Sequence, residues 1–148
     1  MKIVTAFSAA HSITLAFAAL GLVHVPSRVV EPLIALSIVF VAFETLRSHA
    51  GRADLRGPLA FGFGLVHGFG FASVLSEFGL PREALGWSLA GFNIGVELGQ
   101  ACIVVIVSPL LALLLRHAPR AHAQVVRLLA LGIVAAGGFW FVQRLLVR

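Results

Sequence analysis

The chain has 148 residues, of which 59% are apolar and only 11% are charged, and its mean hydropathy is +1.02. Soluble domains carry about 25% charged residues, and a small domain leaves much of its surface in water, so this composition excludes an ordinary soluble protein. The net charge of +5 does not indicate nucleic-acid binding, because the arginines cluster at the ends of apolar runs, where they meet lipid headgroups.

Five apolar runs are each long enough to cross a bilayer as a helix, which takes about 20 residues. In chain order they are residues 3–23, 29–46, 58–76, 84–115 and 125–147. The first run is too long for a signal peptide and carries a central histidine, so we expect it to remain as a helix. The fourth is longer than one span needs, and Pro109 is expected to kink it or to end its membrane part. The sequence therefore predicts an all-α integral membrane bundle of about five transmembrane helices in a single domain, residues 1–148, with no strands.

The distribution of basic residues favours a cytoplasmic N-terminus. The side of the N-terminus would hold Lys2, Arg47, Arg52, Arg56, Arg116, Arg120 and Arg127, and the opposite side Arg28, Arg82, Arg144 and Arg148. Short cytoplasmic loops carry an excess of Lys and Arg. With five spans, the C-terminus is then expected to be extracytoplasmic.

Polar side chains lie at about the same depth in three of the predicted spans. They are Ser8, His11 and Thr14 in the first span, His67 in the third, and Asn93, Glu97 and Gln100 in the fourth. The three in the fourth span follow the i, i+4, i+7 pattern of one helix face. Polar groups inside a membrane are costly and mark functional sites by default. We therefore expect these faces to turn inward and meet.

Two glutamates belong to the second predicted helix, and they are candidates for a vestibule. Glu31 lies at its outer end and Glu44 near its cytoplasmic end. At about 100° per residue, the two fall on roughly opposite faces, so they cannot both line one narrow path.

Small residues suggest how the third and fourth helices pack. Gly64, Gly68 and Ala72 form one ridge, and Gly91, Gly95 and Gly99 form another. Ridges of small residues at this spacing let helix backbones approach closely in lipid. Close packing of these two helices would bring His67 and Glu97 within bonding reach.

Two imidazoles, a carboxylate and two amides suit a divalent transition metal such as nickel, zinc, copper or iron. His11, His67 and Glu97 are the candidate ligands, with Asn93 and Gln100 in support. Three alternatives stay open: a buried hydrogen-bond network that fixes helix register, an intramembrane metal-dependent hydrolase, and a structural subunit that needs a partner. The sequence has no H-E-x-x-H motif and no nucleotide-binding motif, so we expect neither an enzyme nor ATP hydrolysis by this chain.

At these residues the sequence resembles the divergent second branch of the HupE/UreJ family of bacterial membrane proteins. The segments that carry the resemblance are TAFSAAHSITLAFAALGL, VEPLIALSIVFVAFETL, FGFGLVHGFGFASVLSEFGLP, GFNIGVELGQ and a final helix ending GGFWFVQR. The resemblance implies an inner-membrane nickel permease, or an accessory protein that feeds nickel to hydrogenase and urease, with His11, His67 and Glu97 as metal ligands or relay points. Longer proteins of this type have a preceding helix with a Gly-x-Asp-His motif, which this sequence lacks. We therefore expect a short form, a fragment, or a chain that works as a homo-oligomer or with a partner membrane subunit.

Overall fold

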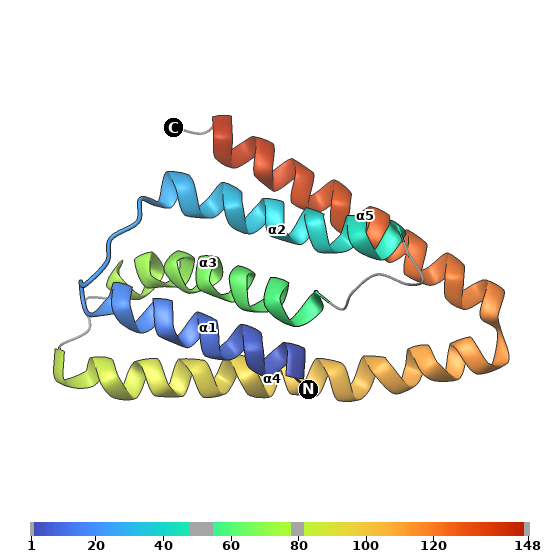
Figure 1. The fold of residues 1–148 in the computed structure, drawn as a ribbon, viewed down its shortest axis with the longest axis horizontal. Coiled ribbons are helices and arrows are strands. Elements are labelled where there is room, and N and C mark those ends of the chain that lie inside the picture. Colours follow the sequence, from blue (N-terminus) through green and yellow to red (C-terminus); the bar gives the residue numbers. More distant parts are fainter. Residues whose placement is uncertain (1, 48–54, 78–81, 147–148) are drawn as a thin grey trace.

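The computed structural model describes residues 2–47, 55–77 and 82–146, and within them the chain forms five helices and no strand (Figure 1). The helices are α1 (Lys2–Ala19), α2 (Ser27–Arg47), α3 (Arg56–Glu77), α4 (Arg82–His117) and α5 (Pro119–Leu146). The all-α bundle predicted from the sequence is thus confirmed. Arg52 and Arg148, which enter the orientation prediction, lie outside the described residues, as does residue 147 at the predicted end of the last helix.

The first helix ends four residues before its apolar run does. Gly21 adopts a φ of 73°, the left-handed conformation that glycine reaches without strain. The amide of Leu22 donates to the carbonyl oxygen of Phe17 at 2.9 Å, and the amide of Gly21 donates to the carbonyl oxygen of Ala18 at 3.0 Å. This pair of bonds is the Schellman motif, which satisfies the last carbonyls of a helix. The predicted end at residue 23 was therefore wrong, because a backbone cap and not hydropathy terminates the helix.

The helices α4 and α5 are longer than predicted and almost continuous. The helix α4 runs through Pro109 to His117, and only Ala118 separates it from Pro119, the first residue of α5. Proline fits the first position of a helix, where its missing amide hydrogen is not needed. The amide of His122 donates to the carbonyl of Ala118 at 2.9 Å, which closes the first turn of α5. The polar loop expected between residues 115 and 125 is therefore mostly helical.

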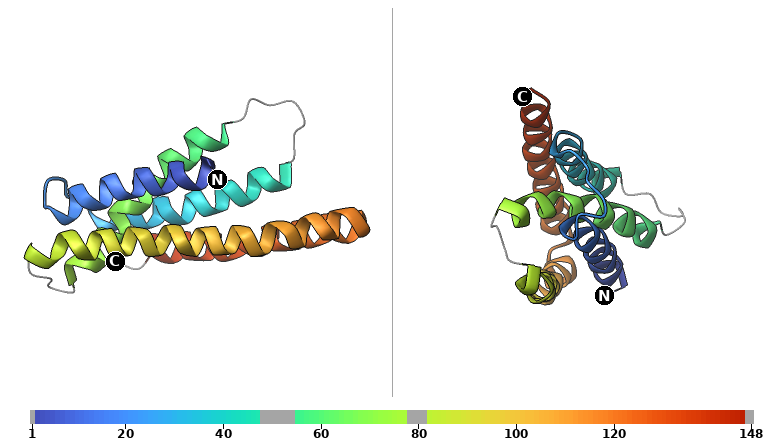
Figure 2. Two further views of the ribbon diagram at one scale, coloured as in Figure 1. Left: turned by 90° about the horizontal axis from the view of Figure 1, so that it is seen from below. Right: turned by 90° about the vertical axis from the view of Figure 1, so that its left-hand side faces the viewer.

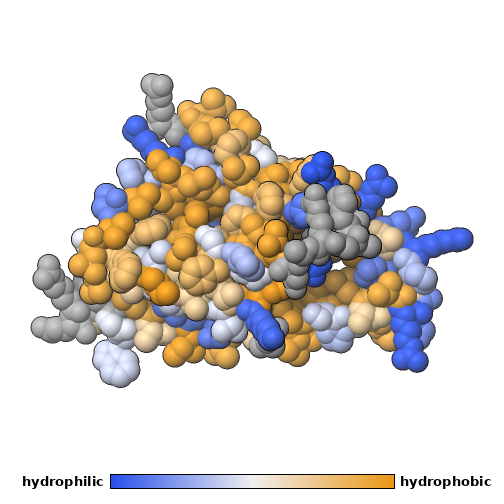
Figure 3. All heavy atoms as spheres, viewed as in Figure 1, coloured by the Kyte–Doolittle hydropathy of each residue, from blue (hydrophilic) through white to orange (hydrophobic). Residues whose placement is uncertain are grey.

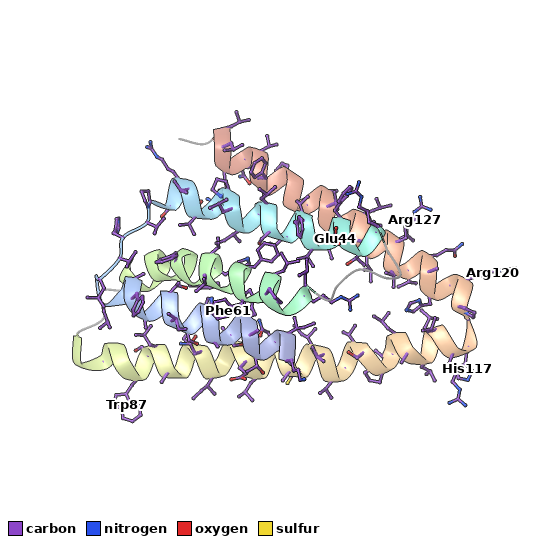
Figure 4. All side chains as sticks on the ribbon, viewed as in Figure 1. Glu44, Phe61, Trp87, His117, Arg120 and Arg127 are labelled. Atoms are coloured by element: carbon purple, nitrogen blue, oxygen red, sulfur yellow. The ribbon has the colours of Figure 1, made fainter. Side chains whose placement is uncertain are left out.

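The five helices lie side by side in the order α4, α1, α3, α2, α5 (Figures 1 and 2). The helices α4 and α5 diverge from their connection, and the other three lie between them. Glu44, His117, Arg120 and Arg127 gather at one end of the bundle, whereas Trp87 lies at the other (Figure 4).

The face shown in Figure 3 is mostly apolar, and many of its hydrophilic side chains gather toward one end. Among the described residues, α1, α2, residues Gly86–His117 of α4, and α5 are long and apolar enough to cross a membrane. Large side chains on them, such as Ile103 and Leu128, are more than half exposed, as lipid-facing residues are. The chain is therefore a multi-pass membrane protein. The 22-residue helix α3 packs between α1 and α2, and its crossing of the membrane stays a prediction.

Glycines bring α3 into close contact with α1. A Cβ atom added at Gly64 would meet the carbonyl oxygen of Phe7 and would lie 2.9 Å from Cβ of Ala10. One added at Gly68 would meet Oγ1 of Thr14 and the carbonyl oxygen of His11. The two backbones therefore approach as closely as they do only because these positions lack side chains. This contact places the polar face of α1 directly against α3.

Candidate functional site

Among the side chains that the structure describes, His11 of α1 is the most deeply buried polar one. It is 2% exposed, and within the described residues neither of its ring nitrogens has a hydrogen-bond partner. Its ring stacks on Phe7, with centroids 6.0 Å apart, and on Phe92 of α4, at 6.1 Å. The ring of Phe71, from α3, meets it edge-on at 5.6 Å. Three helices thus converge on His11, but α3 and α4 reach it with phenylalanine rings and not with the polar side chains that the sequence predicted.

His67, on α3, is half-buried and also contacts Phe7. The two rings meet edge-on, with centroids 5.3 Å apart. Nε2 of His67 lies 2.9 Å from Oγ of Ser37, which belongs to α2 and is buried. Sequence reasoning missed Ser37. The available signal was that it is the one polar residue between Glu31 and Glu44 in the second apolar run.

The remaining polar residues of α1 face inward, but they have different partners. Oγ of Ser8 donates a hydrogen bond to Oε1 of Gln100 on α4, at 3.1 Å. Oγ1 of Thr14 donates within its own helix, with the carbonyl oxygens of Ala10 and His11 at 3.3 and 3.4 Å. Ser8 therefore joins two helices, whereas Thr14 supports the packing against α3.

On α4, only part of the predicted polar face turns toward α1. Asn93 and Gln100 are half-buried, but Glu97 is exposed. Among the described residues, no group of three or more His, Cys, Asp or Glu side chains is arranged to hold a metal ion. The structure thus places His11 and His67 against one phenyl ring and does not bring Glu97 to them as a third ligand. Their roles as metal ligands stay predictions.

The expected packing of the two glycine ridges was wrong. The glycines of α3 face α1, where the small side chain of Ala10 leaves room for them. A Cβ atom added at Gly91, Gly95 or Gly99 would meet nothing within 4 Å. The helix α3 reaches α4 through a long side chain instead, since the rings of Phe71 and Phe92 lie 5.1 Å apart. The side chain of Ala72, the third member of the α3 ridge, lies outside the described part.

The two glutamates of α2 lie toward opposite ends of that helix. The carboxylate of Glu31 forms an ion pair with Arg144 of α5 at 3.0 Å, and both side chains are more than a third exposed. Glu44 lies at the end of the bundle that also holds Arg120 and Arg127 (Figure 4). Glu31 thus joins α2 to α5, and a vestibule role for either residue stays a prediction.

Comparison with known protein families gives a match over nearly the whole chain. The family model described as HupE / UreJ protein matches residues 1–144. No curated protein and no solved structure matches the chain.

Proposed function

Because the chain belongs to the HupE/UreJ family, we propose that it is a membrane permease, or an accessory component, for a divalent transition metal, with nickel as the favoured cargo. The family is associated with metal transport and accessory functions. The observation that carries the proposal is the buried imidazole of His11, which has no partner for either nitrogen among the described residues.

An unpartnered polar group in the interior costs about 1–3 kcal/mol. A purely structural position would be filled at lower cost by an apolar side chain. A neutral imidazole is, however, a good ligand for nickel and its neighbours in the first transition row. His67 supplies a second imidazole, which meets the ring of Phe7 edge-on at 5.3 Å. The pair thus offers a cation two successive ligands where α1 meets α3.

The position of Phe71 is consistent with a path by which a cation could reach His11. The ring of Phe71 covers one edge of the imidazole, yet the residue is 44% exposed. A ring with one free side turns away from its neighbour more easily than an enclosed one. Rotation of this side chain would uncover His11 without separating the helices.

The negative charge of Glu97 is consistent with a cation as the transported species. Glu97 lies within the membrane-spanning part of α4 and is exposed. A carboxylate inside a bilayer costs a few kcal/mol, and a cation beside it offsets part of that cost. Glu97 precedes Gln100 by less than one helical turn, and Gln100 is bonded to Ser8 of α1. We place Glu97 beside the route as a charge that attracts the metal.

Transport of this kind needs no chemical step in the chain itself. The cation would move down its gradient or be driven through another subunit, and the protein would act as a homo-oligomer or with a partner. We also propose that the membrane is the bacterial inner membrane, with the N-terminus cytoplasmic. The gathering of His117, Arg120 and Arg127 at one end supports this orientation (Figure 4). Reporter fusions at each terminus test it, and a cytoplasmic C-terminus would contradict it.

The decisive experiment is Ni²⁺ uptake by liposomes that contain the purified protein. We expect His67→Ala and Glu97→Gln to lower the initial uptake rate at least about tenfold, the lower range for loss of a group that supports a metal site. The matched control is His24→Ala, since His24 is exposed in the connection after α1. Uptake at the wild-type rate in both test variants would remove these residues from the mechanism. A wild-type protein that binds no Ni²⁺, moves none and co-purifies with another membrane protein would favour a structural subunit.

A further inference from the structure

Ser37 makes two short contacts through a single oxygen atom. It lies in α2 and is 5% exposed. Its Oγ is 2.7 Å from the carbonyl oxygen of Ile34 in the same helix and 2.9 Å from Nε2 of His67 in α3. Both distances are those of good hydrogen bonds.

The number of hydrogens decides the direction of these two bonds. A serine hydroxyl has one hydrogen and two lone pairs, and a carbonyl oxygen can only accept. The contact with Ile34 is therefore favourable only if the hydroxyl hydrogen points at its carbonyl oxygen. That leaves Oγ of Ser37 as an acceptor toward His67. Nε2 of His67 must then be the donor in the second bond.

A neutral imidazole carries one N–H, so a hydrogen on Nε2 leaves the lone pair on Nδ1. We propose that Ser37 is a positioning residue that holds His67 in the Nε2–H tautomer, so that Nδ1 is the atom offered to a cation. Histidines that bind metals almost always donate their other N–H to a fixed acceptor, which sets both the tautomer and the ring orientation. The metal part of this assignment rests on the proposed function, but the tautomer does not.

The tautomer is measured by nitrogen NMR on protein with ¹⁵N-labelled histidine in lipid bilayers, where protonated and unprotonated ring nitrogens have well-separated shifts. The signals of His67 are identified by their loss in His67→Ala. In the metal-free wild type at a pH where His67 is neutral, we expect a protonated Nε2 and an unprotonated Nδ1. In Ser37→Ala the acceptor is gone, and we expect a mixture of tautomers. Ser37→Thr keeps a hydroxyl and should restore the wild-type spectrum.

Ser12→Ala is the matched control, because the hydroxyl of Ser12 donates within its own helix, to the carbonyl oxygen of Ser8 at 2.7 Å. We expect it to leave the signals of His67 unchanged. A protonated Nδ1 in the wild type would overturn the proposal. So would a Ser37→Ala spectrum in which His67 keeps the wild-type tautomer.

The metal part is tested with Ni²⁺ affinity and with Zn²⁺ as a diamagnetic probe. Loss of an acceptor behind a metal-binding histidine typically lowers affinity about 10–100-fold, and we expect a fall of this size in Ser37→Ala but not in Ser12→Ala. Added Zn²⁺ should move the Nδ1 signal of His67, and binding through Nε2 would overturn the assignment. A wild type that binds neither metal would refute the proposed function, whereas the metal-free spectra would still decide the tautomer.

Discussion

Gly68 offers the sharpest test of the helix packing that positions both histidines. In Gly68→Ala the new methyl group would meet Oγ1 of Thr14 and the carbonyl oxygen of His11, and it would lie 2.9 Å from the amide nitrogen of Leu15. Two of these neighbours are backbone atoms, which cannot turn aside as a side chain does, so α1 must move away from α3. Overpacking of this kind costs about 1–3 kcal/mol.

Gly95→Ala is the matched comparison, because a Cβ atom at Gly95 would meet nothing within 4 Å. Both substitutions give the same gain of about 1 kcal/mol in helix propensity, which cancels between them. We therefore expect the free energy of unfolding of the Gly68 variant to be lower by about 1–3 kcal/mol. The assay is reversible unfolding by sodium dodecyl sulfate in mixed micelles, followed by circular dichroism. Equal free energies for the two variants would refute the close contact of α1 with α3.

Three other residues or pairs give further tests. His11→Phe should leave the free energy of unfolding unchanged or raise it by about 1 kcal/mol, because it removes two nitrogens that have no partner within the described ranges. The same variant should lose Ni²⁺ uptake, and a variant that unfolds more easily and keeps its uptake would contradict both expectations. The bond of Ser8 to Gln100 should show a coupling of about 0.5–1.5 kcal/mol in a double-mutant cycle with Ser8→Ala and Gln100→Leu, and no coupling would mean that the bond does not form. Both side chains of the Glu31–Arg144 ion pair are more than a third exposed, so a cycle with Glu31→Gln and Arg144→Gln should give at most about 0.5 kcal/mol, and a larger value would show that the pair is shielded from water.

Hydropathy predicted the number of helices and most of their boundaries, because an apolar run of the right length has one low-energy form in a bilayer. The ends of α2 and α3 lie within two residues of the predicted positions. The end of α1 was wrong because a cap at Gly21 depends on backbone hydrogen bonds that hydropathy does not measure. The predicted start of α5 was wrong because polar residues after an apolar run can belong to a loop or can continue a helix, and here they continue the helix.

The sequence predicted that His11 lies in the interior of the bundle, but it did not predict which side chains surround it. A histidine within a span indicates a polar centre, and His11 does lie where α1, α3 and α4 meet. Glycine spacing shows that another helix can approach that face closely, but it does not show which helix does so. The ridge of α3 was therefore predicted to pack against α4, whereas it packs against α1. Ser37 was missed for a related reason, since a serine in a span usually bonds to its own backbone. Only the position of α2 beside α3 reveals its second contact, with His67.

The short connection between α4 and α5 has a consequence for the shape of the protein outside the membrane. At about 1.5 Å per residue, a helix as long as α4 measures roughly 54 Å, well beyond a hydrocarbon core of about 30 Å. The two helices are joined by Ala118 alone. We therefore expect the joined ends of the two helices to extend beyond the lipid as a stiff helical hairpin, tipped by His117 and Arg120, in place of a flexible loop. Proteases that cut extended chain should find little to cleave there, and a tag inserted at this tip would be held at a fixed distance from the lipid surface.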